Sequence, residues 1–392
     1  MSNLSLAVLE RNYAQFGLSD NPFPSTGVPD DHPTIYIGQP EVLTALQSVL
    51  LAMIATGRSN HLILTGSYGN GKSHTLKFVK TELEARSGEL PRPLCIGYVS
   101  QPGTTFLDIY REFMFDLGYE RIREKAQTYL GRVAYQLHQE GKIEDEVDPD
   151  RAWEDIQEGK VLLSDVVPRA LERLNRSVQF MDFARAFVTM AYDENSINAW
   201  DWLNGSGIDY PQRRQMGLTK NMTDTHSLRA FAALKSVLKE IDNSAVAILI
   251  DEFECIGNLQ ARTRQNMLNA MRHLIDMHPS DLSLVIACAP EIWQMLISDY
   301  HAFSDRISKE VPLKPMDLSL MQELVTAYLN QARDRASEAT DPFSGEALTS
   351  IYELGMGNTR RILTICSQAI EAYATCPGSA IDGAMIRNLY AV

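Results

Sequence analysis

The sequence predicts an α/β fold in which helices cover both faces of a parallel sheet, with a large helical insertion and a C-terminal helical domain. Short runs of aliphatic and β-branched residues alternate with helical patterns, which is the arrangement that forms a doubly wound parallel sheet. One long stretch interrupts this alternation and another follows it, and both contain only helical patterns. A glycine-rich segment at 66–73 joins the first strand-like run to a helical pattern.

Four segments are expected to form strands. Each is short and largely apolar and is bounded by turn or polar residues, as in a parallel sheet that is buried on both faces. The four are 61–65, 94–99, 245–250 and 282–288. The helical patterns between them include 73–86, 106–117 and 227–241.

Two longer stretches contain no convincing strand. Residues 118–225 hold helical patterns such as 161–174 and 180–192, and we interpret them as an insertion. The patterns after residue 317 are at 318–332, 344–354, 359–374 and 381–389. The expected domains are residues 1–117 (leader and first part of the core), 118–225 (insertion), 226–316 (second part of the core) and 317–392 (helical lid domain).

Composition limits the classes of protein to consider. A chain of 392 residues predicts two or three packed units, and a net charge of -14 excludes a uniformly basic nucleic-acid-binding surface. The five cysteines are far apart and show no CxxC spacing, which indicates a reducing, cytoplasmic setting rather than disulfides or a zinc site. We expect no secretory signal in the first thirty residues and no membrane helix, because no apolar run approaches the roughly 18 residues that such a helix needs.

The strongest motif satisfies the pattern G-x-x-x-x-G-K-[ST] between a predicted strand and a predicted helix. Its glycines let backbone amides turn toward an anion, and the following helix presents its positive N-terminal end. Lys72 would reach the β- and γ-phosphates, and the Ser73 hydroxyl would coordinate Mg²⁺. The candidate nucleotide-binding residues are Gly66, Ser67, Tyr68, Gly69, Asn70, Gly71, Lys72, Ser73 and the adjacent His74. The alternative is a plain glycine-rich turn.

Two adjacent carboxylates end the apolar run 245–250. Asp251 would support Mg²⁺, and Glu252 would polarise the attacking water, pointing the other way because neighbouring residues of a strand alternate. Many strands end in an acidic residue, so the alternative is that these carboxylates only mark the end of a strand and bind no metal. Paired with the glycine-rich motif, the two carboxylates indicate a magnesium-dependent nucleotide site.

Two arginines could complete such a site. Arg306 follows the run 282–288 and its helix, where it could reach the γ-phosphate of a neighbouring subunit; the alternative is a solvent-facing ion pair with Asp305 or Glu310. Arg360, in Gly-Asn-Thr-Arg at 357–360, opens a C-terminal helix and could contact the nucleotide from that side. Its alternative is likewise an exposed ion pair.

Together these motifs resemble those of the AAA+ ATPases over nearly the whole chain. Residues 66–73 are similar to the Walker A motif, Asp251 and Glu252 to the Walker B pair, Arg306 to the arginine finger and Arg360 to the sensor 2 arginine. The resemblance implies a P-loop NTPase core with a lid, ATP and Mg²⁺ as cofactors, hydrolysis of ATP to ADP and phosphate, and a homo-oligomer such as a ring. The boxes 16–18 and 21–23, followed by Tyr-Ile-Gly-Gln at 36–39, are similar to the leader of origin-initiator and transposition-regulator ATPases, where this leader lies against the adenine.

The insertion narrows the resemblance. Trp-Asp-Trp-Leu-Asn-Gly at 200–205, the segment 213–218 and Asp-Glu-Phe-Glu at 251–254 resemble the ATP-binding proteins of BREX-type phage-defence systems. This implies a protein partner in a defence or DNA-processing system. The tryptophans have two interpretations: they dock a protein partner, or they anchor the insertion to the core of the protein.

Two features depart from the AAA+ pattern. At the sensor 1 position, Cys288 and Ala289 replace the usual polar residue, which favours slow turnover. We also expect no winged-helix domain like that of the origin initiators after the C-terminal helices.

Two functions follow from this resemblance. The first is an ATPase whose hydrolysis drives or regulates assembly of a DNA-associated complex, in anti-phage defence. The alternative is a slow, ATP-gated scaffold that oligomerises and recruits a nuclease, helicase or transposase. A small-metabolite kinase is disfavoured by the lid and by the carboxylate pair.

We expect any contact with DNA to be local or to occur through a partner. The alternative is that the basic residues belong to solvated helix faces. The candidate residues are Arg121, Arg123, Lys125, Arg213 and Arg214.

Overall fold

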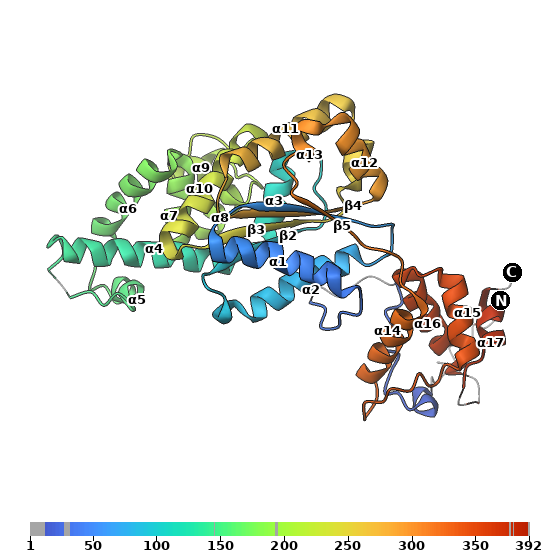
Figure 1. The fold of residues 1–392 in the computed structure, drawn as a ribbon. Helices are drawn as coiled ribbons and strands as arrows, with labels where there is room; N and C mark the ends of the chain where they lie inside the picture. Colours follow the sequence, from blue (N-terminus) through green and yellow to red (C-terminus); the bar gives the residue numbers. More distant parts are fainter. Residues whose placement is uncertain are drawn as a thin grey trace, which may run out of the picture. The chain divides into compact units, whose positions relative to one another are not determined.

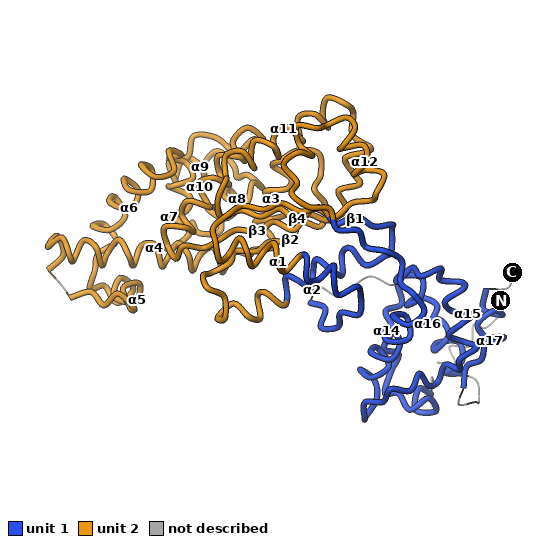
Figure 2. The backbone as a smooth tube through the Cα atoms, viewed as in Figure 1, with its two compact units in different colours: residues 1–45, 64–81, 311–392 blue, residues 46–63, 82–310 orange. Residues whose placement is uncertain are grey.

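The computed structural model describes residues 12–26, 32–144, 146–192, 195–375, 378 and 380–390. The chain forms two compact units, and each is assembled from separate segments (Figure 2). The first unit combines residues 1–45, 64–81 and 311–392, and the second combines 46–63 and 82–310. The start of the predicted leader, residues 1–11, lies outside the described residues.

A five-stranded sheet with the strand order β2-β3-β4-β1-β5 is the centre of the fold. The strands are β1 (Asn60–Thr65), β2 (Leu94–Val99), β3 (Ala245–Ile250), β4 (Leu282–Cys288) and β5 (Lys309–Pro312). β2, β3 and β4 are parallel, with Leu94 opposite Ala245 and Val246 opposite Leu282. Every residue of β3 and β4 is buried, which explains why their sequences are continuously apolar.

Helices cover the sheet on both faces, with α3 and α11 on one side and α1 on the other (Figure 1). Thr105 and Asp108 form a capping box at the start of α3, which fixes where this helix begins. The observed sheet and helices confirm the predicted α/β fold. α1 (Pro40–Thr56) precedes β1. Outside the insertion, the helices between strands are α2 (Lys72–Ala85), α3 (Phe106–Leu117), α10 (Asp224–Asp242), α11 (Ala261–Met277), α12 (Pro290–Asp299) and α13 (His301–Ser304).

The insertion is helical, and no strand occurs in the described part of residues 118–225. Its helices share one continuous hydrophobic core with the sheet, to which Phe187 of the insertion, Phe231 of α10 and Ile248 of β3 all belong. The insertion is therefore packed as part of the second unit. Its helices are α4 (Tyr119–Gln139), α5 (Ala152–Gln157), α6 (Leu163–Val178), α7 (Met181–Ala191), α8 (Ser196–Leu203) and α9 (Tyr210–Gln215).

The C-terminal helices form a separate hydrophobic core within the first unit. They are α14 (Leu318–Gln331), α15 (Gly345–Gly355), α16 (Thr359–Tyr373) and α17 (Gly383–Tyr390). The two boxes of the leader pack into this core through Phe16, Leu18 and Phe23. The side-chain amide of Asn21 donates hydrogen bonds to the Ser367 carbonyl oxygen (3.1 Å) and to Glu371 (2.9 Å) on α16.

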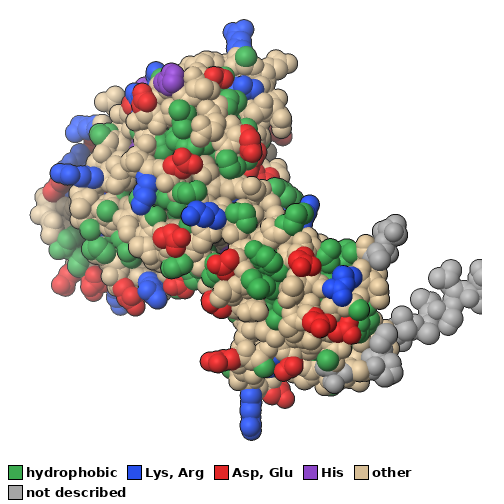
Figure 3. Space-filling view, turned by 45° about the vertical axis from the view of Figure 1, so that its right-hand side comes forward, with side chains coloured by type: hydrophobic (Ala, Val, Ile, Leu, Met, Phe, Trp, Pro, Cys, Tyr) green, Lys and Arg blue, Asp and Glu red, His purple; other side chains and the backbone are tan. Residues whose placement is uncertain are grey.

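Two predictions from composition concern the charge of the surface and the apolar character of the helices. On the face seen in Figure 3, acidic and basic side chains are interspersed, without one continuous basic area. None of the helices in the described ranges combines the length and the apolar character needed to cross a bilayer.

Candidate nucleotide-binding site

The glycine-rich loop connects β1 to α2, as the sequence predicts. Gly69 and Gly71 have positive φ angles of 82° and 94°, a backbone region that glycine enters without strain. The buried Lys72 side chain donates hydrogen bonds from Nζ to the carbonyl oxygens of Gly66 (2.8 Å) and Ser67 (3.5 Å). Ser73 is the second residue of α2, so it lies at the helix end where an anion is stabilised.

The loop is suited to a phosphate group. A Cβ atom added at Gly71 would meet nothing within 4 Å, so the loop leaves open space there. The loop offers backbone amides, the ammonium of Lys72 and the hydroxyl of Ser73, which together match the anionic oxygens of a phosphate and its metal ion. Asn70 is buried, and its Nδ2 donates to the carbonyl oxygen of Leu313 at 3.4 Å, which ties the loop to the chain after β5.

The start of α16 holds the other end of the loop. Asn358 caps α16, accepting a hydrogen bond from the Arg361 amide at 3.1 Å, and its Nδ2 donates to the Tyr68 carbonyl oxygen at 2.6 Å. The backbone amide of Arg360 donates to the Gly69 carbonyl oxygen at 3.1 Å. The residues that sequence analysis assigned to the loop and to the C-terminal helix therefore meet within the first unit.

The last part of the leader contacts α2 at His74, the residue that follows the loop. Its Nε2 forms a hydrogen bond with the Ile35 carbonyl oxygen (2.7 Å), and its ring stacks on Tyr36 with 6.2 Å between centroids. Tyr36 also stacks on Phe78 at 5.1 Å, and burial raises the pKa of its hydroxyl. The segment around Tyr36 thus runs along α2, whereas a direct contact of His74 with a nucleotide stays a prediction.

Asp251 directly follows β3 and is 2% exposed. Its amide donates to the Val99 carbonyl oxygen at 2.9 Å, so the pairing with β2 continues one residue beyond the strand. Its Oδ1 accepts a hydrogen bond from the Glu252 amide (2.9 Å), and its Oδ2 accepts one from the Tyr98 hydroxyl (2.7 Å). Burial, and then the charge of Asp251, raise the pKa of Tyr98. Both carboxylate oxygens are therefore held in place.

Glu252 is exposed and has a φ angle of 47°, in the left-handed region. The alternation of strand residues, from which its direction was predicted, therefore does not extend to Glu252. A non-glycine residue in this region marks a local constraint that is common near functional sites. The exposed carboxylate is free of the strand and accessible to water.

The sensor 1 position is apolar in the structure as in the sequence. Cys288 is the last residue of β4 and is fully buried, and α12 begins at Pro290. Neither Cys288 nor Ala289 presents an amide or hydroxyl side chain that could orient a water molecule. The position that resembles sensor 1 therefore lacks the polar side chain that is usual in AAA+ proteins.

Arg306 forms a two-pronged ion pair with Asp276 of α11. Its Nε and Nη2 atoms lie 2.7 and 3.0 Å from the two carboxylate oxygens, and the pair lowers the pKa of Asp276. The partner is thus Asp276 rather than the predicted Asp305 or Glu310. The Arg306 side chain is 32% exposed, and a role toward a neighbouring subunit stays a prediction.

Four of the five candidate DNA-contacting residues make side-chain contacts within the chain, and Arg214 is exposed. Arg121 pairs with Glu84 at 3.0 Å and Lys125 pairs with Asp242. Arg123 lies over the Tyr119 ring at 5.8 Å, and Arg213 donates to the Ile208 carbonyl oxygen at 2.8 Å. These contacts fit the interpretation of solvated helix faces.

The tryptophans of the insertion anchor it. Trp202 is 1% exposed, and its Nε1 donates to the Lys220 carbonyl oxygen at 2.8 Å. Trp200 packs edge-on against Tyr119 and Phe115, with centroid distances of 6.2 and 6.5 Å. This geometry supports the anchoring interpretation.

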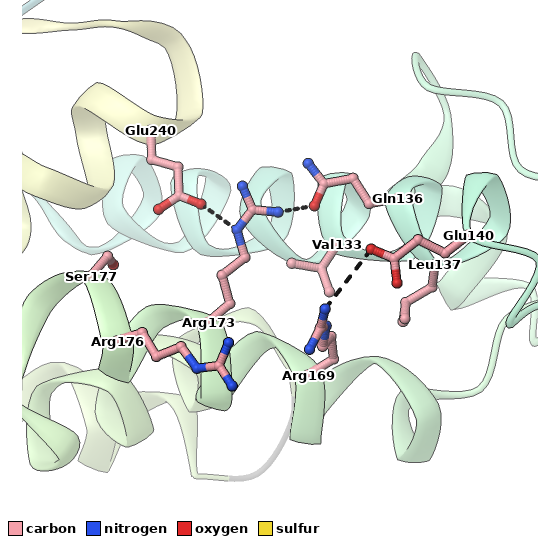
Figure 4. Close-up of a pocket in the computed structure, with 9 residues that line it drawn as sticks. All are labelled: Val133, Gln136, Leu137, Glu140, Arg169, Arg173, Arg176, Ser177 and Glu240. Atoms are coloured by element: carbon pink, nitrogen blue, oxygen red, sulfur yellow. Dashed lines mark hydrogen bonds and ion pairs between the residues drawn. The ribbon is translucent and has the colours of Figure 1, made fainter.

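A pocket of about 360 Å³ between α4, α6 and α10 was not predicted (Figure 4). Arg173 donates to Glu240 at 2.7 Å and to Gln136, and Arg169 lies 3.9 Å from Glu140. The third arginine, Arg176, pairs with Glu172 beside the pocket, so each of the three lining arginines has a carboxylate partner. We assign it no binding role.

No cluster of three or more metal-ligating His, Cys, Asp or Glu side chains occurs among the residues that the structure describes. Mg²⁺ in nucleotide sites is held by one or two protein oxygens together with phosphates and water, so it needs no such cluster. The Asp251 carboxylate and the Ser73 hydroxyl are oxygen donors of the required kind.

The comparisons with known proteins agree with this geometry. Two solved structures share the fold, each at 12% sequence identity. The Aeropyrum pernix ORC2 protein in ADPNP-ADP complexes has a TM-score of 0.52, and the match covers 95% of this chain and 71% of that chain. The Aeropyrum pernix ORC1 protein in complex with DNA has a TM-score of 0.50, and the match covers 93% of this chain and 68% of that chain. No curated protein matches the chain. The family model described as BREX system ATP-binding protein BrxC/D matches residues 24–326. This match spans most of the sequence, and the chain belongs to that family of ATP-binding proteins.

Proposed function

We propose that this protein is a magnesium-dependent ATPase that drives or regulates the assembly of a DNA-associated complex in anti-phage defence. The observation that carries the proposal is the loop 66–73, in which positive-φ glycines and a buried lysine precede a helix. The family match supports ATP as the ligand and a BREX system as the setting. Partner proteins, and oligomers of this chain, are the proposed context of its activity.

Each site residue has a proposed role. The loop amides and Lys72 bind the phosphates, and Ser73 and Asp251 hold Mg²⁺, which supplies charge neutralisation at the phosphates when bound. Glu252 accepts the proton of the attacking water, and its exposure after the strand end supports this role. Arg360 contacts the nucleotide from the C-terminal helices, and Arg306 serves a neighbouring subunit.

A second function is favoured by one specific observation. Because Cys288 and Ala289 offer no polar side chain at the end of β4, the attacking water lacks one of its usual orienting groups. Slow hydrolysis would suit an ATP-gated scaffold that oligomerises and recruits a nuclease, helicase or transposase. In that case hydrolysis acts as a timer and the ATP-bound form is the working state.

Steady-state ATPase assays with and without DNA test the proposal. We expect Lys72→Ala to abolish ATP binding, and Glu252→Gln to bind ATP while losing hydrolysis. Lys77→Ala is the matched control, since Lys77 is another lysine of α2 outside the motif. ATP binding and hydrolysis by Lys72→Ala at the wild-type level would refute the site.

Size measurements separate the two functions. An ATPase that drives assembly turns over ATP while its oligomers form and dissociate. A scaffold forms ATP-dependent oligomers with negligible turnover under every condition, and Glu252→Gln then behaves like the wild type. Light scattering with ATP and with a non-hydrolysable analogue distinguishes these outcomes.

A further inference from the structure

We propose that Tyr98 is a positioning residue for Asp251: its hydroxyl fixes the Asp251 carboxylate in the orientation that binds Mg²⁺. The contact is a hydrogen bond of 2.7 Å from the Tyr98 hydroxyl to Asp251 Oδ2. The inference rests on the proposed function, in which Asp251 is a magnesium ligand.

The strand register explains why these two residues meet. Tyr98 on β2 lies opposite Leu249 on the parallel strand β3. Side chains two residues apart on an extended strand point to the same face, so Asp251 shares the face of Leu249 and of Tyr98. The pairing continues to Asp251, because its amide donates to the Val99 carbonyl oxygen at 2.9 Å. A tyrosine is long enough to span the remaining distance to the carboxylate.

The backbone of Tyr98 is also bonded on the edge of β2 that faces away from β3. β2 is an edge strand of the sheet. Asp116 of α3 accepts a hydrogen bond from the Tyr98 backbone amide at 2.8 Å, which occupies a donor that no further strand pairs. The backbone that carries the phenol is therefore fixed between β3 and α3. A fixed donor can restrict the rotation of the carboxylate that it contacts.

The two hydrogen bonds on Asp251 have different origins. Oδ1 accepts from the amide of Glu252, the adjacent residue, whereas Oδ2 accepts from a different strand. Without the phenol, the carboxylate could still bond the Glu252 amide, but its other oxygen would lose the group that sets its direction. Each carboxylate oxygen has lone pairs for more than one partner, so the hydroxyl does not prevent metal binding.

The phenol lies beside a carboxylate that is 2% exposed, and its hydroxyl is the donor in the hydrogen bond between them. Replacing it with phenylalanine keeps the ring packing and removes one hydrogen bond to a charged group.

The experiment measures metal binding rather than turnover. Mn²⁺ binding is followed by electron paramagnetic resonance in the presence of ATP, for the full-length wild type, Tyr98→Phe and Asp251→Asn. We expect Tyr98→Phe to weaken Mn²⁺ affinity about tenfold and to alter the spectrum of the bound ion, as expected for losing a hydrogen bond to a charged group. ATP affinity in the absence of divalent metal should be unchanged.

Tyr129→Phe is the matched control. Tyr129 is a buried tyrosine of α4 whose hydroxyl donates to the Ala170 carbonyl oxygen at 3.5 Å. It should leave Mn²⁺ binding unchanged, which separates positioning from general loss of a buried hydroxyl. Thermal unfolding of both variants checks that they are folded.

The outcomes distinguish the two levels of the proposal. If Asp251→Asn binds Mn²⁺ and ATP like the wild type, the magnesium role of Asp251 is wrong and the inference falls with it. If Asp251→Asn weakens Mn²⁺ binding while Tyr98→Phe matches the wild type in affinity and spectrum, the proposed function stands and the role of Tyr98 is overturned.

Discussion

The guanidinium carbon of Arg360 lies 4.5 Å from the centre of the Tyr68 ring, and its Nη1 atom hydrogen-bonds the Tyr68 hydroxyl. Tyr68 belongs to the glycine-rich loop and is 74% exposed. The arginine assigned to nucleotide contact is thus stacked on a residue of the loop itself. We expect this side chain to leave the ring when it contacts a phosphate.

Replacing Tyr68 should therefore strengthen ATP binding. An exposed cation–π contact is worth about 0.5–1 kcal/mol, so Tyr68→Ala is expected to tighten ATP affinity by about two- to fivefold. Titration with a fluorescent ATP analogue measures this change. Tyr210→Ala is the control, because Tyr210 is also exposed and lies under Arg213 at 5.9 Å, in the second unit. Weaker binding by Tyr68→Ala would show that the tyrosine supports the nucleotide directly.

Gly69 and Asn358 should be energetically coupled. A Cβ atom at Gly69 would lie 2.4 Å from Asn358 Oδ1, and the φ angle of 82° strains any other residue. Asn358→Ala alone should cost about 1 kcal/mol, as for other N-caps, and Gly69→Ala should cost more. In urea unfolding the double variant is expected to be more stable than the sum of the single changes predicts, since it removes the clash. Strict additivity would contradict the contact.

Arg306 is expected to act on a neighbouring subunit, since its exposed ion pair with Asp276 is weak enough to break. Arg306→Ala should lower ATP turnover at least about tenfold without changing ATP affinity. Asp276→Ala, which removes the ion pair alone, should keep turnover near the wild-type value. Mixing Arg306→Ala with Lys72→Ala subunits should restore part of the activity, and a mixture as inactive as its components would argue against action between subunits.

Acid should destabilise the second unit through His61. Its Nδ1 accepts a hydrogen bond from the Leu284 amide at 3.2 Å, and burial lowers its pKa to about 4. The folded protein therefore keeps this imidazole neutral, whereas the unfolded chain binds a proton below about pH 6.5. Between pH 6.5 and 4 the free energy of unfolding should fall as the pH falls, by up to about 1.4 kcal/mol per pH unit from this residue.

Urea unfolding at a series of pH values measures this slope. His278, whose pKa burial also lowers to about 4, adds a similar contribution. His61→Gln keeps an acceptor for the Leu284 amide but does not titrate, so its slope should be smaller than that of the wild type. Equal slopes would mean that His61 is protonated without cost.

The strands of the sheet were predictable where burial requires a continuous run of apolar residues. β2, β3 and β4 lie at the predicted residues because each is a continuous apolar run. β5 leaves no such trace: of Lys309–Pro312 only Val311 is buried, and the strand pairs at the sheet edge. α1 was not predicted, although its buried residues, such as Leu46, Leu50 and Met53, recur at helical spacing.

The candidate site was predictable where a single segment of the sequence contains the motif. The loop 66–73 and the pair at Asp251 satisfy patterns that a single segment displays. Tyr98 and Asn358 were missed because their importance depends on pairing with distant residues: Tyr98 with a carboxylate 153 positions away, and Asn358 with a carbonyl 290 positions away. No local pattern contains either relationship.

The packing of the leader against α16 joins segments about 350 residues apart, as in the hydrogen bond from Asn21 to Glu371. The first unit therefore cannot close during synthesis until α16 has left the ribosome, whereas residues 46–63 and 82–310 are available earlier to build the second unit. A chain that stops short of α16 would keep its glycine-rich loop but lack Asn358 and Arg360. The contacts of Asn358 and Arg360 with that loop thus form only after the start of α16 has been synthesised.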